Sequence, residues 1–226
     1  MTALKRSILE KRMGRMNPMQ KKAIFQAEGP VLILAGAGSG KTTVLVNRIA
    51  YLLNFGNAYQ EGQEATSPDV MGFLREVDAG RREAGVAELQ EAFRACPVNP
   101  WNVLAITFTN KAANELKERL NSLLGEDGLS VNAGTFHYIC LRILRREIEA
   151  LGYARNFTIY DTDDSVRLLK DCLSELNLDD KTFPPKTMLN TISRAKDSML
   201  TPEQYAEENQ DDFRKKVIGN IYKLYQ

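Results

Sequence analysis

The stretch from Leu32 to Thr43, LILAGAGSGKTT, places a loop of small residues directly before one lysine and two threonines. Glycine carries no side chain, so the backbone N–H groups of such a loop can approach crowded phosphate oxygens. Lys41 adds a full positive charge at the β and γ phosphates, and the Thr42 hydroxyl suits a Mg²⁺ ion that bridges them. A tight turn between a strand and a helix would explain the glycines, but it explains neither Lys41 nor Thr42. We therefore predict a triphosphate and Mg²⁺ site made by Ala35, Gly36, Ala37, Gly38, Ser39, Gly40, Lys41, Thr42 and Thr43.

The residues on either side of this loop predict one strand–loop–helix unit. Val31 to Ala35 is an unbroken apolar run, which is typical of a strand buried on both faces. Residues 41–54 place apolar side chains at helical spacing, and the positive end of that helix favours a phosphate anion. Asn17-Pro18-Met19-Gln20 is typical of a helix start with Asn17 as the N-cap, and this helix is expected to run to about Glu28.

The rest of the chain predicts further alternation of strands and helices, followed by helices alone. Strands are predicted at Val103–Phe108 and Leu129–Ala133, and helices at Asn110–Leu124 and from about Thr135 to Leu151. Such alternation implies an α/β fold with a parallel sheet. The last part predicts a smaller helical subdomain, with helices at Asp161–Leu176, Pro185–Ser198, Pro202–Glu208 and Asp212–Tyr225.

Phe55 to Pro100 differs in composition from the segments around it. Gly56 and Ser67-Pro68 mark loops, and two short helices are predicted at Asp69–Ala79 and Arg82–Ala95. The arginines of this excursion would allow contact with DNA or with a partner. Its more numerous acidic residues favour a solvated face.

Composition and charge limit the class of protein. The 226 residues are 43% hydrophobic with a formal net charge of +1, which is ordinary for a soluble globular chain of one large or two small domains. No apolar stretch is long enough to cross a membrane, and the basic start lacks the apolar core of a signal peptide. Three scattered cysteines indicate reduced thiols in a cytoplasmic protein, and a single histidine argues against structural zinc. The lysines and arginines of residues 1–22 either touch nucleic acid or form a solvated tail.

Four segments, in this order, carry a resemblance to a known family. They are MNPMQKKAI (16–24), LAGAGSGKTT (34–43), AITFTNKAANELKERL (105–120) and AGTFHYICLRILR (133–145). Together they closely resemble the N-terminal half of superfamily 1A DNA helicases of the UvrD/Rep/PcrA type, in which the glycine loop commonly begins with alanine, as at Ala35. The resemblance implies an α/β P-loop NTPase fold, with a RecA-like parallel sheet flanked by helices and a mostly helical 1B subdomain. It implies that residues 1–135, with the 55–100 insertion, form part of subdomain 1A and that residues 136–226 form subdomain 1B.

The resemblance also implies roles in binding ATP. Gln20 matches the glutamine that reads adenine, and an amide suits adenine because it donates and accepts hydrogen bonds. The residues alone also allow Gln20 to be the capping-box partner of Asn17, and one side chain can serve both ends. Lys41 and Thr42 match catalytic positions, with Thr42 on Mg²⁺. Thr43 departs from the family, since several relatives have an arginine there near the adenine.

A single-stranded DNA surface is implied at the carboxyl ends of two strands, where open parallel sheets place ligands. Phe108 matches the family's aromatic residue that stacks on a DNA base, although its place in an apolar strand also fits a core residue. His137 matches a phosphate-contacting segment, and the alternative is a satisfied histidine near a helix start. The implied DNA-binding residues are Thr107, Phe108, Thr109, Asn110, Lys111, Gly134, Thr135, Phe136 and His137.

The whole protein implied by the resemblance is an ATP-dependent 3′→5′ DNA helicase of DNA repair or replication. Its cofactors are ATP and Mg²⁺, and its partners are single-stranded DNA, single-strand/duplex junctions and repair or replication proteins. No Asp-Glu-x-x-Gln segment occurs in the chain, so we expect an N-terminal piece that stops before the Walker B motif and hydrolyses almost no ATP. The alternatives are a helicase-nuclease subunit of the same superfamily, a non-catalytic P-loop module that binds DNA, and a P-loop kinase.

Overall fold

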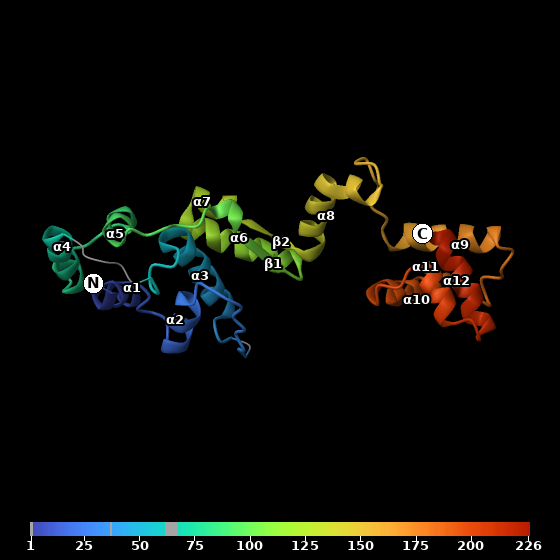
Figure 1. Ribbon diagram of the computed structural model, residues 1–226, viewed down its shortest axis with the longest axis horizontal. Coiled ribbons are helices and arrows are strands. Elements are labelled where there is room, and N and C mark those ends of the chain that lie inside the picture. Colours follow the sequence, from blue (N-terminus) through green and yellow to red (C-terminus); the bar gives the residue numbers. More distant parts are fainter. Residues whose placement is uncertain (1, 37, 62–66) are drawn as a thin grey trace. The chain divides into compact units, whose positions relative to one another are not determined.

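The computed structural model describes residues 2–36, 38–61 and 67–226, and it divides into two compact units (Figure 1). The first unit is Met1–Leu151 and the second is Gly152–Gln226. The division therefore follows Leu151, whereas the subdomain boundary expected from the family lies between residues 135 and 136. That subdomain assignment stays a prediction.

The N-terminal part of the first unit is a cluster of helices around one apolar core. The core takes Ile8 and Leu9 from the first helix, Phe25 from the second, Tyr51 from the third, and Leu74 from the fourth. Figure 1 shows the first helix beside the fourth, and the two are in contact. The helices are α1 (Thr2–Arg12), α2 (Pro18–Phe25), α3 (Lys41–Phe55), α4 (Pro68–Asp78) and α5 (Val86–Phe93).

Helix α1 ties part of the basic N-terminus into the fold. Lys5 is buried, and its ammonium donates to the Glu61 carbonyl oxygen at 3.0 Å. Burial disfavours the charged ammonium and holds the pKa of Lys5 below its usual value. Arg6 donates to the Tyr59 carbonyl oxygen at 3.0 Å. Lys5 and Arg6 thus contact the excursion after α3, so this part of the segment is not a solvated tail, and contact of the other basic residues with nucleic acid stays a prediction.

Two parallel strands form the sheet in the described residues. Strand β1 (Leu104–Thr107) pairs with β2 (Asn132–Thr135), in a register that runs from Leu104 opposite Asn132 to Thr107 opposite Thr135. The strand predicted at Val103–Phe108 is confirmed at its centre. The one predicted at Leu129–Ala133 is wrong at its start, because Glu126–Ser130 forms helix α7 instead. A side chain at Gly128 would stand 2.3 Å from the Leu120 carbonyl oxygen, so glycine lets α7 pack tightly on the preceding helix.

The strand predicted at Val31–Ala35 is not formed. This segment has no regular secondary structure, and Leu32 and Leu34 are 84% and 86% exposed. A strand needs a hydrogen-bonding neighbour, and among the described residues the sheet consists of β1 and β2 only. The apolar pattern therefore predicted a strand that has no partner among the described residues. The α/β class is confirmed in a coarse form, with a small parallel sheet.

The sheet packs against α3 and α6 (Asn110–Leu124) through a second apolar core. Ile49 and Leu53 of α3 and Leu116 and Leu120 of α6 meet Ala105 of β1 there. The helix predicted from Thr135 to Leu151 is α8 (Phe136–Glu147), and its last residues turn into the 3-10 helix η2 (Ile148–Leu151). A short 3-10 helix, η1 (Pro100–Asn102), precedes β1.

The second unit is a four-helix cluster with its own core. Asp161 and Thr201 each begin a helix with a capping box, which fixes two of the predicted helix starts. The Tyr222 hydroxyl donates to the Leu200 carbonyl oxygen at 2.9 Å and ties the last helix to the preceding loop. No helix in the described part of the chain is long and apolar enough to cross a membrane. The helices are α9 (Thr162–Glu175), α10 (Pro185–Asp197), α11 (Pro202–Glu208) and α12 (Phe213–Tyr225).

Candidate functional site

The glycine loop before α3 depends on two backbone positions that favour glycine. Gly38 has φ 74° and Gly40 has φ 83°, in the left-handed region, where a residue with a side chain would be strained. Gly40 is the N-cap of α3, and no side chain caps this helix among the described residues. The first N–H groups of α3 are therefore not satisfied by a capping side chain and can meet an anion. Ala37, also predicted to lie in the loop, falls outside the described residues.

Lys41 turns back onto the loop that precedes it. Its ammonium donates to the Gly36 carbonyl oxygen at 2.7 Å and to the Ala35 carbonyl oxygen at 3.2 Å. The Ser39 hydroxyl donates to the same Gly36 oxygen at 2.8 Å, which tightens the turn. An ammonium has three N–H donors, so one remains for a phosphate oxygen at the loop. Lys41 is thus held by the residues that would cradle the phosphates.

Thr42 and Thr43 lie in the first turn of α3 and are half-buried. The Thr43 carbonyl oxygen accepts from the Asn47 side chain at 2.8 Å. Thr42 directly follows Lys41, so its hydroxyl belongs to the same helix start as the Lys41 ammonium. A hydroxyl at this place fits a Mg²⁺ ion that also contacts the phosphates.

Gln20 joins helix α2 to the loop. Its side-chain oxygen accepts from the Asn17 backbone N–H at 2.9 Å, and the Asn17 side chain accepts from the Gln20 backbone N–H at 2.9 Å. The capping box expected from the sequence is therefore present. The Gln20 amide nitrogen also donates to the Ser39 carbonyl oxygen at 3.2 Å. One amide N–H remains, so capping and adenine recognition are compatible in this residue.

A pocket of about 570 Å³ extends from Gln20 to Lys41. One wall is the face of α2 that carries Met19 and Ala23, and the opposite wall is the segment Val31–Gly36. This volume lies in the usual range for small-molecule and cofactor sites. The apolar walls suit a base, and the loop at the Lys41 end suits phosphates.

The carboxyl ends of β1 and β2 place two aromatic residues side by side. Since Thr107 pairs with Thr135, the next residues, Phe108 and Phe136, leave neighbouring strands at the same edge. Their ring centroids are 5.5 Å apart, with an interplanar angle of 43°. Phe108 is 88% exposed, so it is not a core side chain in this structure. Its predicted contact with a DNA base stays a prediction.

The polar residues next to these rings are partly occupied by the fold itself. The Thr109 hydroxyl accepts from the Ala112 N–H at 3.2 Å and caps α6, which also contains the exposed Asn110 and Lys111. Thr107 donates to the Thr109 carbonyl oxygen at 3.2 Å. Capping was not part of the sequence interpretation of Thr109, although the pattern of a threonine before a helix would have allowed it.

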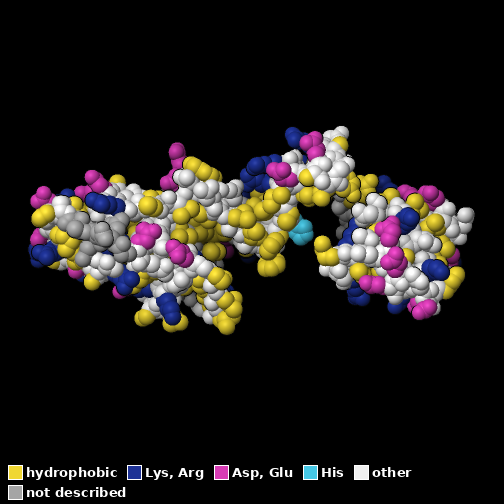
Figure 2. Space-filling model, in the orientation of Figure 1, with side chains coloured by type: hydrophobic (Ala, Val, Ile, Leu, Met, Phe, Trp, Pro, Cys, Tyr) yellow, Lys and Arg dark blue, Asp and Glu magenta, His cyan; other side chains and the backbone are white. Residues whose placement is uncertain are grey.

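Thr135 has the same role at α8. Its side chain is buried, and its hydroxyl accepts from the Tyr138 N–H at 3.3 Å. A Cβ at Gly134 would stand 2.5 Å from Cδ1 of Tyr138, so glycine makes room for that ring. His137 is exposed on the first turn of α8. Figure 2 shows this one histidine in cyan, next to hydrophobic side chains.

Comparison with known proteins gives the family. The family described as UvrD/REP helicase N-terminal domain matches residues 16–62 and 86–226. The chain belongs to this family. It is 40% identical over 211 residues to the ATP-dependent DNA helicase PcrA of Bacillus subtilis, covering 93% of this chain and 23% of that protein. It is 38% identical over 214 residues to the ATP-dependent DNA helicase PcrA of Staphylococcus aureus strain Mu50, covering 95% of this chain and 24% of that protein.

The comparison confirms the resemblance found in the sequence. The chain spans about a quarter of the length of these relatives, with 23% and 24% of the two proteins covered. Two segments lie outside the family match, residues 1–15 and residues 63–85. The first includes α1, and the second includes α4.

Proposed function

We propose that this chain binds ATP with Mg²⁺ and single-stranded DNA, as the N-terminal part of an ATP-dependent DNA helicase. The observation that carries the proposal is the Lys41 ammonium, held by the carbonyl oxygens of Ala35 and Gly36 at the uncapped start of α3. The Gln20 amide lies at the other end of the adjoining pocket. Family membership and the ATP-dependent relatives support the same nucleotide.

Each residue of the nucleotide site has a defined part in this proposal. Backbone N–H groups of the loop and of the first turn of α3 bind the phosphates, and Lys41 neutralises their charge. Thr42 holds Mg²⁺, which offsets negative charge on the phosphates during transfer. Gln20 binds adenine with its remaining amide N–H. No Asp-Glu-x-x-Gln segment occurs in the 226 residues, so we expect the chain alone to bind ATP without appreciable turnover.

In the DNA part of the proposal, bases stack on Phe108 and Phe136, and the surrounding polar residues contact the sugar-phosphate backbone of the DNA. Stacking on aromatic rings tolerates any base sequence, which suits an enzyme that moves along a strand. For the whole protein we propose 3′→5′ unwinding in repair or replication, in the cytoplasm. Subdomains 1A (residues 1–135, RecA-like) and 1B (residues 136–226) belong to the same proposal. A helicase-nuclease subunit and a non-catalytic P-loop module remain the alternatives.

The nucleotide proposal is tested by titrating the chain with Mg-ATP. We expect Lys41→Ala to lower the affinity for Mg-ATP by at least about tenfold, because a charged hydrogen bond to phosphate is removed. The exposed Lys170→Ala in α9 serves as the matched control and is expected to bind like the parent chain. Equal affinity of the Lys41→Ala variant and the parent would refute the proposed site.

A further inference from the structure

The two segments outside the family match pack against each other. The Ser7 hydroxyl donates to Oδ1 of Asp78 at 2.7 Å, and Nζ of Lys11 lies 2.6 Å from the same oxygen. Arg12 donates to the Ala84 carbonyl oxygen at 3.1 Å. Helix α1, from residues 1–15, and helix α4, from residues 63–85, therefore form one structure, which we call the accessory layer.

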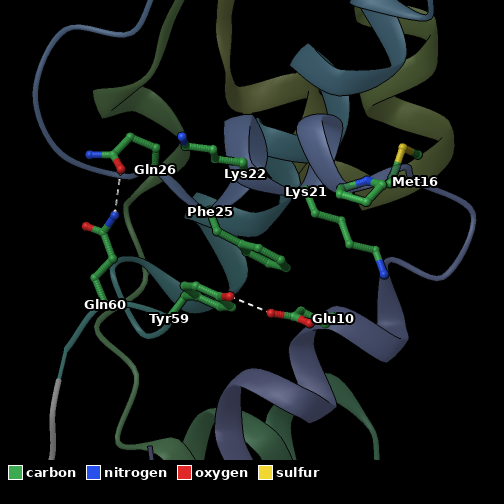
Figure 3. A pocket seen from close by; sticks show the side chains of 9 residues that line it. Glu10, Met16, Lys21, Lys22, Phe25, Gln26, Tyr59 and Gln60 are labelled. Atoms are coloured by element: carbon green, nitrogen blue, oxygen red, sulfur yellow. Dashed lines mark hydrogen bonds between the residues drawn. The ribbon is translucent and has the colours of Figure 1, made fainter. Parts of the chain in front are cut away.

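The accessory layer meets helix α2 at a pocket of about 340 Å³ (Figure 3). Tyr59 stands at its centre, with its ring stacked on Phe25 of α2 at a centroid distance of 4.3 Å and an interplanar angle of 1°. The Tyr59 hydroxyl donates to the carboxylate of Glu10, which extends from the end of α1. Figure 3 shows the Tyr59 ring beside Phe25, with its hydroxyl directed at the Glu10 carboxylate. The next residue, Gln60, donates from its amide to the Gln26 side-chain oxygen at 3.0 Å.

The backbone of Tyr59 is fixed as firmly as its ring. Its N–H donates to the Tyr51 hydroxyl of α3 at 2.9 Å, and its carbonyl oxygen accepts from Arg6 of α1 at 3.0 Å. The Arg6 guanidinium lies 5.2 Å from the centroid of the Tyr59 ring. Tyr59 thus joins α1, α2 and α3 at one point.

Helix α2 connects this point to the nucleotide pocket. Tyr59 and Gln60 contact its C-terminal end at Phe25 and Gln26, and Gln20 at its other end binds Ser39 of the glycine loop. The helix has eight residues, so its length is about 12 Å. So short a helix moves as one body. A displacement of Phe25 is therefore expected to displace the Gln20 amide as well.

We propose that Tyr59 and Gln60 are positioning residues for adenine recognition: they hold α2 so that the Gln20 amide meets the base. The inference rests on the proposed ATP site and adds the device that sets its base specificity. Phosphate binding depends on the backbone of the loop and on Lys41, which do not contact Tyr59 or Gln60 in the described residues. The Gln20 amide also touches the loop at the Ser39 carbonyl oxygen, but bonds from Lys41 and Ser39 to the Gly36 carbonyl oxygen hold the loop without it. Binding of the phosphates is therefore expected to change much less than binding of the base.

The test compares two probes on the full chain, Mg-ATP and Mg-tripolyphosphate. The double variant Tyr59→Leu/Gln60→Ala is expected to bind Mg-ATP about fivefold to tenfold more weakly, the scale of one aromatic pair and one hydrogen bond. Its affinity for tripolyphosphate is expected to change less than about twofold, within the usual error of additivity. Arg81→Ala, which removes an exposed ion pair with Glu76 elsewhere in the excursion, is the matched control and is expected to change neither.

A double-mutant cycle separates positioning from a general loss of structure. In a Gln20→Ala background, the Tyr59→Leu/Gln60→Ala change is expected to have no further effect on Mg-ATP affinity, because the amide that it positions is absent. The same loss in both backgrounds, or an equal loss for tripolyphosphate, would overturn the inference. If the double variant does not fold, Gln60→Ala alone, which removes only the bond to Gln26, replaces it. It is expected to weaken Mg-ATP binding about twofold to threefold and to leave tripolyphosphate affinity unchanged. Failure of Lys41→Ala to weaken tripolyphosphate would instead refute the ATP site itself.

Discussion

Helices α6 and α8 each follow a strand of the sheet, whereas α3 follows the apolar segment Val31–Ala35 and the glycine loop, and the helices differ in what caps them. The hydroxyl groups of Thr109 and Thr135 accept hydrogen bonds from backbone N–H groups at the starts of α6 and α8. Helix α3 begins at Gly40, where no side chain caps it among the described residues. Because a cap satisfies the groups that would bind an anion, α3 is the better phosphate site. The starts of α6 and α8 instead present the rings of Phe108 and Phe136.

The largest expected effect in this comparison comes from Gly40→Ala. A Cβ there would stand 3.2 Å from the Gln20 amide nitrogen, in a backbone conformation with φ 83°. We expect the variant to lose Mg-ATP binding by at least about tenfold, together with about 1–2 kcal/mol of unfolding free energy. Titration and thermal unfolding measure the two effects separately.

Gly80→Ala is the matched control for that variant. Gly80 also has a positive φ, 72°, but a Cβ at this position would meet nothing within 4 Å. Its stability is expected to fall by a similar amount while its Mg-ATP affinity is unchanged. If Gly80→Ala lost nucleotide as well, the loss in Gly40→Ala would reflect stability and not the loop.

Phe108→Ala tests the other side of the comparison. We expect single-stranded DNA binding to weaken by about 1–3 kcal/mol, the usual contribution of one stacked base. The side chain is 88% exposed, so the unfolding free energy is expected to change little. Fluorescence anisotropy with a labelled oligothymidine measures the affinity, and Leu123→Ala, an exposed apolar residue on α6, is the control. An unchanged affinity would assign DNA binding elsewhere.

Thr109→Ala is expected to have smaller effects, on stability and on DNA affinity. Loss of a threonine N-cap typically costs about 1 kcal/mol of unfolding free energy. The hydroxyl accepts the Ala112 N–H and keeps its own O–H for a phosphate oxygen, so the affinity for single-stranded DNA is expected to fall by about twofold to fivefold. Unchanged stability would show that capping is secondary, and an unchanged DNA affinity would remove Thr109 from the proposed DNA surface.

The smallest expected effect concerns pH and the accessory layer. Hydrogen bonds from Lys11 and then Ser7 hold the pKa of Asp78 below the usual aspartate value of 3.8. The stability that this carboxylate contributes is present above that value and is lost as pH falls through the lower pKa of the folded state. Asp78→Asn is therefore expected to flatten the acid end of the stability profile slightly. Asp180→Asn in the second unit is the control, and an equal change there would remove the special role of Asp78.

The sequence predicted the parts whose signals are local. The glycine loop, the Asn17–Gln20 capping box and most helices follow from residue types at short spacing, and the structure contains them. Helix α1 was missed because its charges dominated the pattern, whereas Ile8 and Leu9 are buried by segments distant in sequence. The contacts of Lys5 with Glu61 and of Tyr59 with Glu10 were missed as well, because their partners lie 56 and 49 residues away along the chain. The strand expected at Val31–Ala35 depended on a neighbour that no local pattern reveals.

The central claim is that Lys41 and Phe108 belong to two separate binding surfaces, one for nucleotide and one for DNA. The most direct measurement is a reciprocal titration of both variants with Mg-ATP and with oligothymidine. We predict that Lys41→Ala loses at least about tenfold in Mg-ATP affinity and keeps its DNA affinity, while Phe108→Ala loses about fivefold or more for DNA and keeps its Mg-ATP affinity. Equal losses of both ligands in either variant would contradict this division.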